Sequence, residues 1–193
     1  MKTLYLVMDL INDLVHQDGA NRTGLAAEVE RRHVLTHSKI AIAKARSDGI
    51  PVGYVIVGWS QDYREWPANS PMFGPAREHQ LLKLDTWSTQ IHEAVAPEKE
   101  DYIIIKHRVS PFYGTNLEPI LRAQNISRLV MSGVSTNYVM QSAVREAHDR
   151  GYEVVILEDA CSALSEEEHQ WAIKGLSRMA QVTTSDTFTF ASG

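Results

Sequence analysis

Residues 128–137 have the sequence RLVMSGVSTN, in which an apolar run leads into a Gly-Val-Ser-Thr-Asn turn. Residues 128–131 have the length and the consecutive apolar positions of a strand that is buried on both faces of a sheet. Residues 136–150 then carry helical periodicity, and Gly151 stands just past the last turn, where a glycine commonly ends a helix. This stretch therefore predicts one strand-turn-helix unit of a parallel sheet.

The same alternation of strand and helix runs along the whole chain. Apolar runs predict strands at residues 4–8, 51–57, 102–105, 128–131, 153–157 and 180–183, and helical periodicity is found at residues 25–48, 116–124, 136–150 and 165–178. A β-α-β-α order requires right-handed crossovers, with helices on both faces of the sheet. We predict an α/β fold: a three-layer α/β/α sandwich around a mostly parallel, Rossmann-like sheet of about six strands.

Length and composition indicate an ordinary globular protein. The 193 residues fit a single domain that spans residues 1–193, and 44% hydrophobic with 22% charged residues argue against a disordered chain. The net charge of −5 predicts no nucleic-acid or membrane partner. The first apolar run stops at Asp9, and no window approaches the length of a membrane span, so we expect a cytoplasmic protein.

One segment, residues 59–97, interrupts the alternation. It contains three of the four tryptophans and four of the seven prolines, and it shows little periodicity. Long irregular segments within compact domains usually serve as lids, binding loops or oligomer contacts. We refer to residues 59–97 as the insertion.

Polar residues follow the predicted strands at their carboxyl ends, where open α/β sheets bind ligands. Asp9 ends the first strand, and Lys106 and Arg108 end the third. Taken alone, such residues are more often turn-forming or solvated strand ends. Together, Asp9 and Lys106 predict a partly buried ion pair, and the two cations favour a small anionic substrate.

Other candidate substrate-binding residues are aromatic or belong to the turn after the fourth strand. They are Trp59, Phe112, Tyr113, Val134 and Ser135. The aromatic residues are candidates for the wall of an apolar pocket, although packing in the core is the commoner fate of such side chains.

Several motifs together resemble the isochorismatase-like hydrolases, a superfamily of cysteine hydrolases that includes nicotinamidases, carbamoylsarcosine amidases and isochorismatases. They are Asp9 with Asn12-Asp13 behind it, Lys106, the FYGTNL run at 112–117, the GVSTN turn at 133–137 and the GYEVVILEDAC run at 151–161. These motifs occur in the order of the family and span nearly the whole chain.

The resemblance implies an Asp-Lys-Cys triad in which the cysteine attacks a carbonyl carbon. Asp9 matches the acid/base of this triad and Lys106 its partner. A cis peptide bond is expected at Val134-Ser135, where backbone N–H groups form the oxyanion hole. The resemblance also implies a homo-oligomer, either a dimer or a tetramer, whose insertion offers apolar surface for the contact. No cofactor is expected.

The nucleophile does not follow the family pattern, because Val139 stands at the position of the family's cysteine. The one cysteine, Cys161, follows a different strand, and we interpret it as a small buried filler. Ile11 stands where many members carry glutamine. Covalent thiol catalysis is therefore not expected.

A metal site is not expected either. Nicotinamidase-type members place an aspartate and two histidines after the second strand, where this chain reads GWSQDY. His79 and His92 lie in the insertion without the spacing of metal ligands. The other histidines, His169 among them, are interpreted as surface or helix residues.

Three hypotheses follow. The first is a cysteine-independent hydrolase in which Asp9 protonates the methylene carbon of a vinyl ether before water adds, which requires that burial raise the pKa of Asp9 against the effect of Lys106. The second is a catalytically degenerate member that binds a small molecule or a protein partner. The third, an amidase with another nucleophile, is disfavoured because Ser135 and Thr136 have no evident base beside them.

Overall fold

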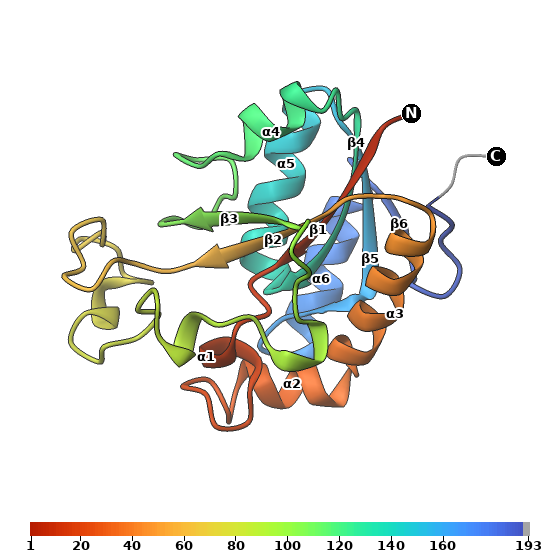
Figure 1. Ribbon diagram of the computed structural model, residues 1–193. Coiled ribbons are helices and arrows are strands. Elements are labelled where there is room, and N and C mark those ends of the chain that lie inside the picture. Colours follow the sequence, from red (N-terminus) through yellow and green to blue (C-terminus); the bar gives the residue numbers. More distant parts are fainter. Residues whose placement is uncertain (191–193) are drawn as a thin grey trace.

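The computed structural model, which describes residues 1–190, has a six-stranded sheet at its centre (Figure 1). All neighbouring strands are parallel, and their order is β3-β2-β1-β4-β5-β6. The strands are β1 Thr3–Met8, β2 Val52–Val57, β3 Tyr102–Lys106, β4 Arg128–Val134, β5 Glu153–Ser162 and β6 Gln181–Thr183. The prediction of a parallel, six-stranded α/β fold is confirmed.

Helices cover the two faces of the sheet in separate groups. The side chains of β1 alternate between them: Leu4 and Leu6 pack into the apolar core that contains the second group, whereas Tyr5 and Val7 pack into the core that contains the first. The first group is α1 Asn12–Val15, α2 Leu25–Arg31 and α3 Val34–Ser47, and the second is α4 Leu117–Ala123, α5 Gln141–Asp149 and α6 Glu166–Leu176. The result is a three-layer sandwich with two apolar cores.

The structure differs from the sequence prediction in two elements. The single helix expected at 25–48 is divided into α2 and α3, because His33 adopts a left-handed backbone conformation with φ of 53°. The consecutive apolar residues of β3 favour a strand buried on both faces, but β3 lies at the edge of the sheet, and Ile103 and Ile105 are 40% and 43% exposed.

The insertion connects β2 to β3 and contains three short 3₁₀ helices, η1 Gly74–Ala76, η2 Trp87–Thr89 and η3 Glu93–Val95. Figure 1 shows part of it (yellow) extending beyond the sheet from the end of β2. Its fully buried Trp59 packs with Phe73 and Leu82 in a third apolar core. Hydrogen bonds from Trp59 N to Leu82 O and from Leu84 N to Trp59 O close this segment on itself.

The order of the strands also creates a switch point between β1 and β4. From β1 the chain proceeds outward through β2 to β3, whereas from β4 it proceeds in the opposite direction to β6. Open α/β sheets bind ligands beyond the carboxyl ends of the strands at such a point. The two strands approach closely there, because Gly133 has φ of +125° and a Cβ atom on it would lie 2.0 Å from Met8 O.

Candidate functional site

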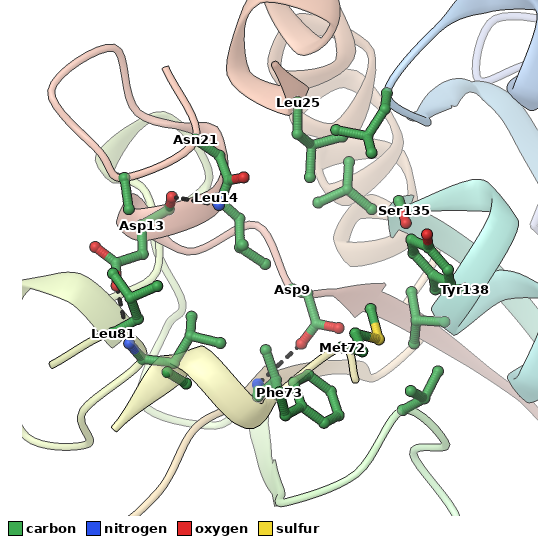
Figure 2. A pocket seen from close by; sticks show the side chains of 18 of the residues that line it. Asp9, Asp13, Leu14, Asn21, Leu25, Met72, Phe73, Leu81, Ser135 and Tyr138 are labelled. Atoms are coloured by element: carbon green, nitrogen blue, oxygen red, sulfur yellow. Dashed lines mark hydrogen bonds between the residues drawn. The ribbon is translucent and has the colours of Figure 1, made fainter. Parts of the chain in front are cut away.

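A cavity of about 360 Å³ lies at the switch point (Figure 2). Most of its wall comes from three parts of the chain: the segment from Asp9 to Leu25, the insertion through residues such as Phe73 and Leu82, and the segment from Val134 to Val139. Val57, Lys106, Val109 and Leu164 complete the lining. Figure 2 shows Asp9 on one side of the open space and Ser135 and Tyr138 on another. Of the residues singled out in the sequence, the structure brings Asp9, Lys106, Val134, Ser135 and Val139 to this one cavity.

Asp9 and Lys106 form a buried ion pair in the cavity wall. Lys106 Nζ lies 2.8 Å from Asp9 Oδ2, and the two side chains are only 2% and 4% exposed. The other oxygen, Asp9 Oδ1, accepts a hydrogen bond from the backbone N–H of Val57. Burial raises the pKa of the Asp9 carboxyl above its ordinary value, and the opposing effects of Lys106 and Val57 do not reverse this rise.

The turn after β4 forms the opposite part of the wall. The Val134-Ser135 peptide bond is cis, as expected. Residues Thr136–Met140 then form one π-helical turn before α5 begins, which places Tyr138 and Val139 on the cavity. Val139 is 2% exposed, so an aliphatic side chain faces the cavity at the position where the family resemblance implies a thiol.

Cys161 does not supply the thiol that is missing at position 139. Its thiol lies in β5, is fully buried outside the cavity lining, and donates to Leu157 O. Burial raises its pKa to about 12, so the reactive thiolate is scarce at neutral pH. The interpretation of Cys161 as a small buried filler is confirmed.

Arg108 does not reach the cavity, in contrast to the sequence prediction. Because β3 ends at Lys106, the chain turns, and the Arg108 guanidinium donates through Nη1 to the backbone carbonyls of Glu65 and His107. It therefore fastens the insertion to the end of β3. One of the two cations on which the expectation of an anionic substrate rested is engaged elsewhere.

The three aromatic candidates also lie outside the cavity lining. Trp59 is fully buried in the core of the insertion. Phe112 packs in the core that contains α4–α6, where it stacks on Tyr152, and Tyr113 is 66% exposed. Core packing and solvent exposure, rather than substrate contact, account for these side chains in the structure.

Most residues of the apolar wall carry no signal in the sequence that marks them as part of a site. Met72, Phe73, Leu81 and Leu82 line the cavity from the insertion, whose irregular sequence was the only signal of a binding segment. Asp13 holds this wall in place, because its Oδ2 accepts a hydrogen bond from the backbone N–H of Leu82 at 2.9 Å.

Thr136 does have a base beside it, His169, so the expectation that no base lies near this hydroxyl is wrong. Thr136 Oγ1 lies 2.8 Å from His169 Nδ1, and His169 Nε2 lies 3.2 Å from Glu158 Oε2 and 2.9 Å from Arg32 Nη2. Nearness along the sequence could not reveal this contact, because His169 comes from α6. Thr136 and His169 are both fully buried and lie outside the cavity lining, so the pair has no access to a substrate. Its hydrogen bond ties the π-helical turn to α6.

Two further observations concern the described part of the chain. Within residues 1–190, no group of three or more histidine, cysteine, aspartate or glutamate side chains is arranged to hold a metal ion. Every helix in this part is too short or too polar to cross a lipid bilayer.

Comparison with known proteins gives one consistent family. A family model described as "Isochorismatase domain" matches residues 3–187. An uncharacterized isochorismatase family protein, YecD, of Escherichia coli O157:H7 is 39% identical over 184 residues, which are 93% of this chain and 90% of that protein.

A ureidoacrylate amidohydrolase, RutB, of Methylorubrum extorquens is 34% identical over 132 residues, which are 62% of this chain. The match spans about half of that relative's length (53%). Among solved structures, an isochorismatase family protein from Desulfovibrio vulgaris superposes with a TM-score of 0.85 at 22% identity, over 96% of this chain and 95% of the other. This last likeness concerns the fold alone.

Proposed function

The chain belongs to the isochorismatase family, and we propose that it is a hydrolase that works without a cysteine nucleophile, with Asp9 as the proton donor. One observation carries the proposal. The buried Asp9–Lys106 pair faces a cavity in which Val139 replaces the thiol that the family's covalent chemistry needs. Proton transfer remains available to this site, whereas attack by a thiolate does not.

The reaction that fits these groups is the hydrolysis of a vinyl ether. Protonated Asp9 donates its proton to the terminal methylene carbon, and the C=C electron pair forms the new C–H bond, leaving an oxocarbenium ion. Water adds to this ion and returns a proton to the Asp9 carboxylate. The resulting hemiketal collapses to an alcohol and a carbonyl compound, so the sum is one vinyl ether plus one water.

The surroundings of Asp9 support both halves of this cycle. The raised pKa keeps the carboxyl protonated over a wider pH range, as a general acid requires. After the proton has left, Lys106 Nζ at 2.8 Å stabilises the carboxylate until water restores the acid.

Amide hydrolysis, which the name of the related ureidoacrylate amidohydrolase indicates for that protein, is less well supported. Within residues 1–190, Ser135 is the one serine or threonine hydroxyl of the cavity lining, and no imidazole contacts it. Thr136, which does contact an imidazole, is closed off from the cavity.

The proposal is tested with two vinyl ethers that differ in charge, phenyl vinyl ether and isochorismate. Acetaldehyde from the first is measured with alcohol dehydrogenase and NADH, and pyruvate from the second with lactate dehydrogenase and NADH. We expect turnover of at least one substrate, and a loss of about 100-fold or more in Asp9→Asn, since general acids typically contribute 10²–10⁴-fold. Asp18→Asn is the matched control, because it makes the same change at a side chain that is 87% exposed.

The aliphatic side chain of Val139 also favours a second function, the binding of a small molecule without catalysis. If neither ether yields product above background while small ligands still raise the melting temperature, the chain is a binding protein that has lost catalysis. Turnover that persists in Asp9→Asn would instead exclude Asp9 as the acid.

We also propose that the chain forms a homo-oligomer through the insertion. The support is Trp87, a large apolar side chain of η2 that is 44% exposed.

A further inference from the structure

Among the described residues, the charged side chains that line the cavity carry no net positive charge. The charged side chains among the described lining residues are Asp9, Asp13 and Lys106. Lys106 is paired with Asp9 at 2.8 Å and also donates to Arg108 O. The Arg108 guanidinium lies outside the lining and donates to backbone carbonyls. With Asp9 ionised the three charged lining groups sum to a charge of −1, and with Asp9 protonated, as the proposed acid requires, they sum to zero. In neither state does an anion that enters the cavity meet a net positive charge that would replace its lost water.

The remainder of the wall is mainly aliphatic or aromatic, and so is its rim. Met72, Tyr138 and Leu164 line the cavity and are 47%, 42% and 46% exposed, respectively. Single exposed apolar side chains are common on proteins, but these three border the same opening. Figure 2 shows Met72 and Tyr138 around the open space, with Leu14 and Leu25 on its other sides. A ligand with an apolar body would bury this rim and gain its transfer free energy.

The size of the cavity sets the scale of the ligand. Its volume of about 360 Å³ is near the lower end of the range for small-molecule sites, roughly 300–1,000 Å³. One ring with a short side chain fits this space.

We propose that the ligand of this cavity is an uncharged, mainly apolar molecule of about this size, in place of the anionic substrate that the sequence indicated. The inference rests on the proposed function in taking the cavity beside Asp9 as the substrate site. A cationic ligand is disfavoured as well, because Asp9 already has its ammonium partner and Asp13 accepts the N–H of Leu82.

The test uses three ligands of nearly equal shape: 3-phenylpropanol, 3-phenylpropanoate and 3-phenylpropylammonium. Dissociation constants are measured at pH 7 by calorimetry or by NMR titration. We expect the alcohol to bind at least tenfold more tightly than either ion. Equal or tighter binding of the carboxylate overturns the inference, and tighter binding of the ammonium overturns it in favour of recognition by the two aspartates.

Two variants locate the binding. Val139→Phe adds a ring inside the cavity and should weaken the alcohol at least tenfold; an unchanged affinity would place binding elsewhere and overturn the inference. If Val139→Phe fails to fold, Leu164→Arg tests instead whether the ligand binds in this cavity, because position 164 is exposed and tolerates a long side chain. It should tighten binding of the carboxylate at least fivefold, whereas Trp171→Arg, at a 72% exposed position outside the cavity lining, should not.

These measurements need no turnover, so they separate this inference from the proposed function. A protein that prefers the alcohol but hydrolyses neither ether supports the inference and contradicts the proposed hydrolase function. A protein that turns over isochorismate and not phenyl vinyl ether, with loss in Asp9→Asn, keeps the function and overturns the inference.

Discussion

Asp9 is held between two hydrogen-bond donors, Lys106 Nζ and Val57 N, at a position where its side chain is almost fully buried. Burial penalises the charged carboxylate more than these donors favour it, and the pKa is raised. A carboxyl with a raised pKa binds its proton up to a higher pH in the folded than in the unfolded chain. Its ionisation therefore lowers the stability of the fold as the pH rises through the folded pKa.

Catalysis should depend on pH in the same direction as stability does. Because the general acid must be protonated, kcat/KM should fall as the pH rises through the pKa of Asp9. In Lys106→Met the loss of the ammonium removes a pKa-lowering influence, so this fall should move to higher pH. The check is a pH-rate profile together with a ¹³C NMR titration of the carboxyl. A profile that rises over this range, or a fall that moves to lower pH in the variant, contradicts the assignment.

Val139 offers a second test at the scale of one residue. Val139→Cys places a thiol on the cavity in the first turn after β4, where partial positive charge from unpaired N–H groups lowers a thiol pKa. We expect iodoacetamide to modify the introduced thiol in this variant at pH 7, while Cys161 stays unmodified because its pKa is about 12. Amide hydrolysis in the variant would show that the remainder of the family site is intact.

Val144→Cys is the matched control for this experiment, because residue 144 is a fully buried valine of α5 outside the cavity lining. Equal labelling of the two variants would mean that the thiol at position 139 has no special environment.

The sequence was informative about single residues where strand ends decide their position. Asp9, Lys106 and Val139 line one cavity because a parallel sheet delivers its carboxyl ends to one edge, and the strand ends can be read from the sequence. Arg108 was misplaced because its direction depends on where β3 ends and on the carbonyl of Glu65, which lies 43 residues away. Contacts of that kind are set by tertiary packing.

At the scale of elements, the insertion and α1 together make one side of the cavity wall, and Asp13 joins them. Its carboxylate is 7% exposed and accepts the N–H of Leu82. Asp13→Ala leaves this buried donor unsatisfied, which costs about 1–3 kcal/mol. Asp13→Asn retains an acceptor oxygen and should recover most of the loss.

The measurements are chemical denaturation and amide hydrogen exchange at Leu82. We expect the exchange protection of Leu82 to fall in Asp13→Ala and to return in Asp13→Asn. Ligand affinity should follow the same order, because Leu82 lines the cavity. A Leu82 amide that stays equally protected in Asp13→Ala would show that other contacts hold this wall.

The same scale shows why helical periodicity was an incomplete guide. The apolar positions of 25–48 continue through the break at His33, since α2 and α3 both cover the same face of the sheet. Periodicity reports which face is buried, but it does not report a single left-handed residue. Likewise, the apolar sequence of β3 did not reveal that Ile103 and Ile105 stand on an uncovered edge.

For the whole molecule, the proposed oligomer makes a simple prediction. If the insertion forms the contact, Trp87→Glu should lower the mass measured by light scattering after size-exclusion chromatography, because a buried carboxylate would oppose association. Trp171→Glu makes the same change at the exposed tryptophan of α6 and should leave the mass unaltered. A monomeric wild-type chain, or an unchanged mass in Trp87→Glu, contradicts the proposal.

The architecture itself was predictable from the sequence, because most strands are short apolar runs and a helix separates successive strands everywhere except across the insertion between β2 and β3. The shape and polarity of the cavity were not. They depend on how the insertion folds back to bring Phe73 and Leu82 to the same cavity as Val134, and this segment has neither strand alternation nor helical periodicity to read.

The position of β1 has a consequence for the synthesis of the chain. β1 is made before the other five strands described, yet it lies inside the sheet, and its partner β4 begins at Arg128, 120 residues after Met8. At about 5–20 residues per second, a ribosome needs on the order of ten seconds to produce that partner. During this interval Leu4–Met8 is an apolar strand with one edge unpaired, so the nascent chain should bind a ribosome-associated chaperone until residue 134 has emerged.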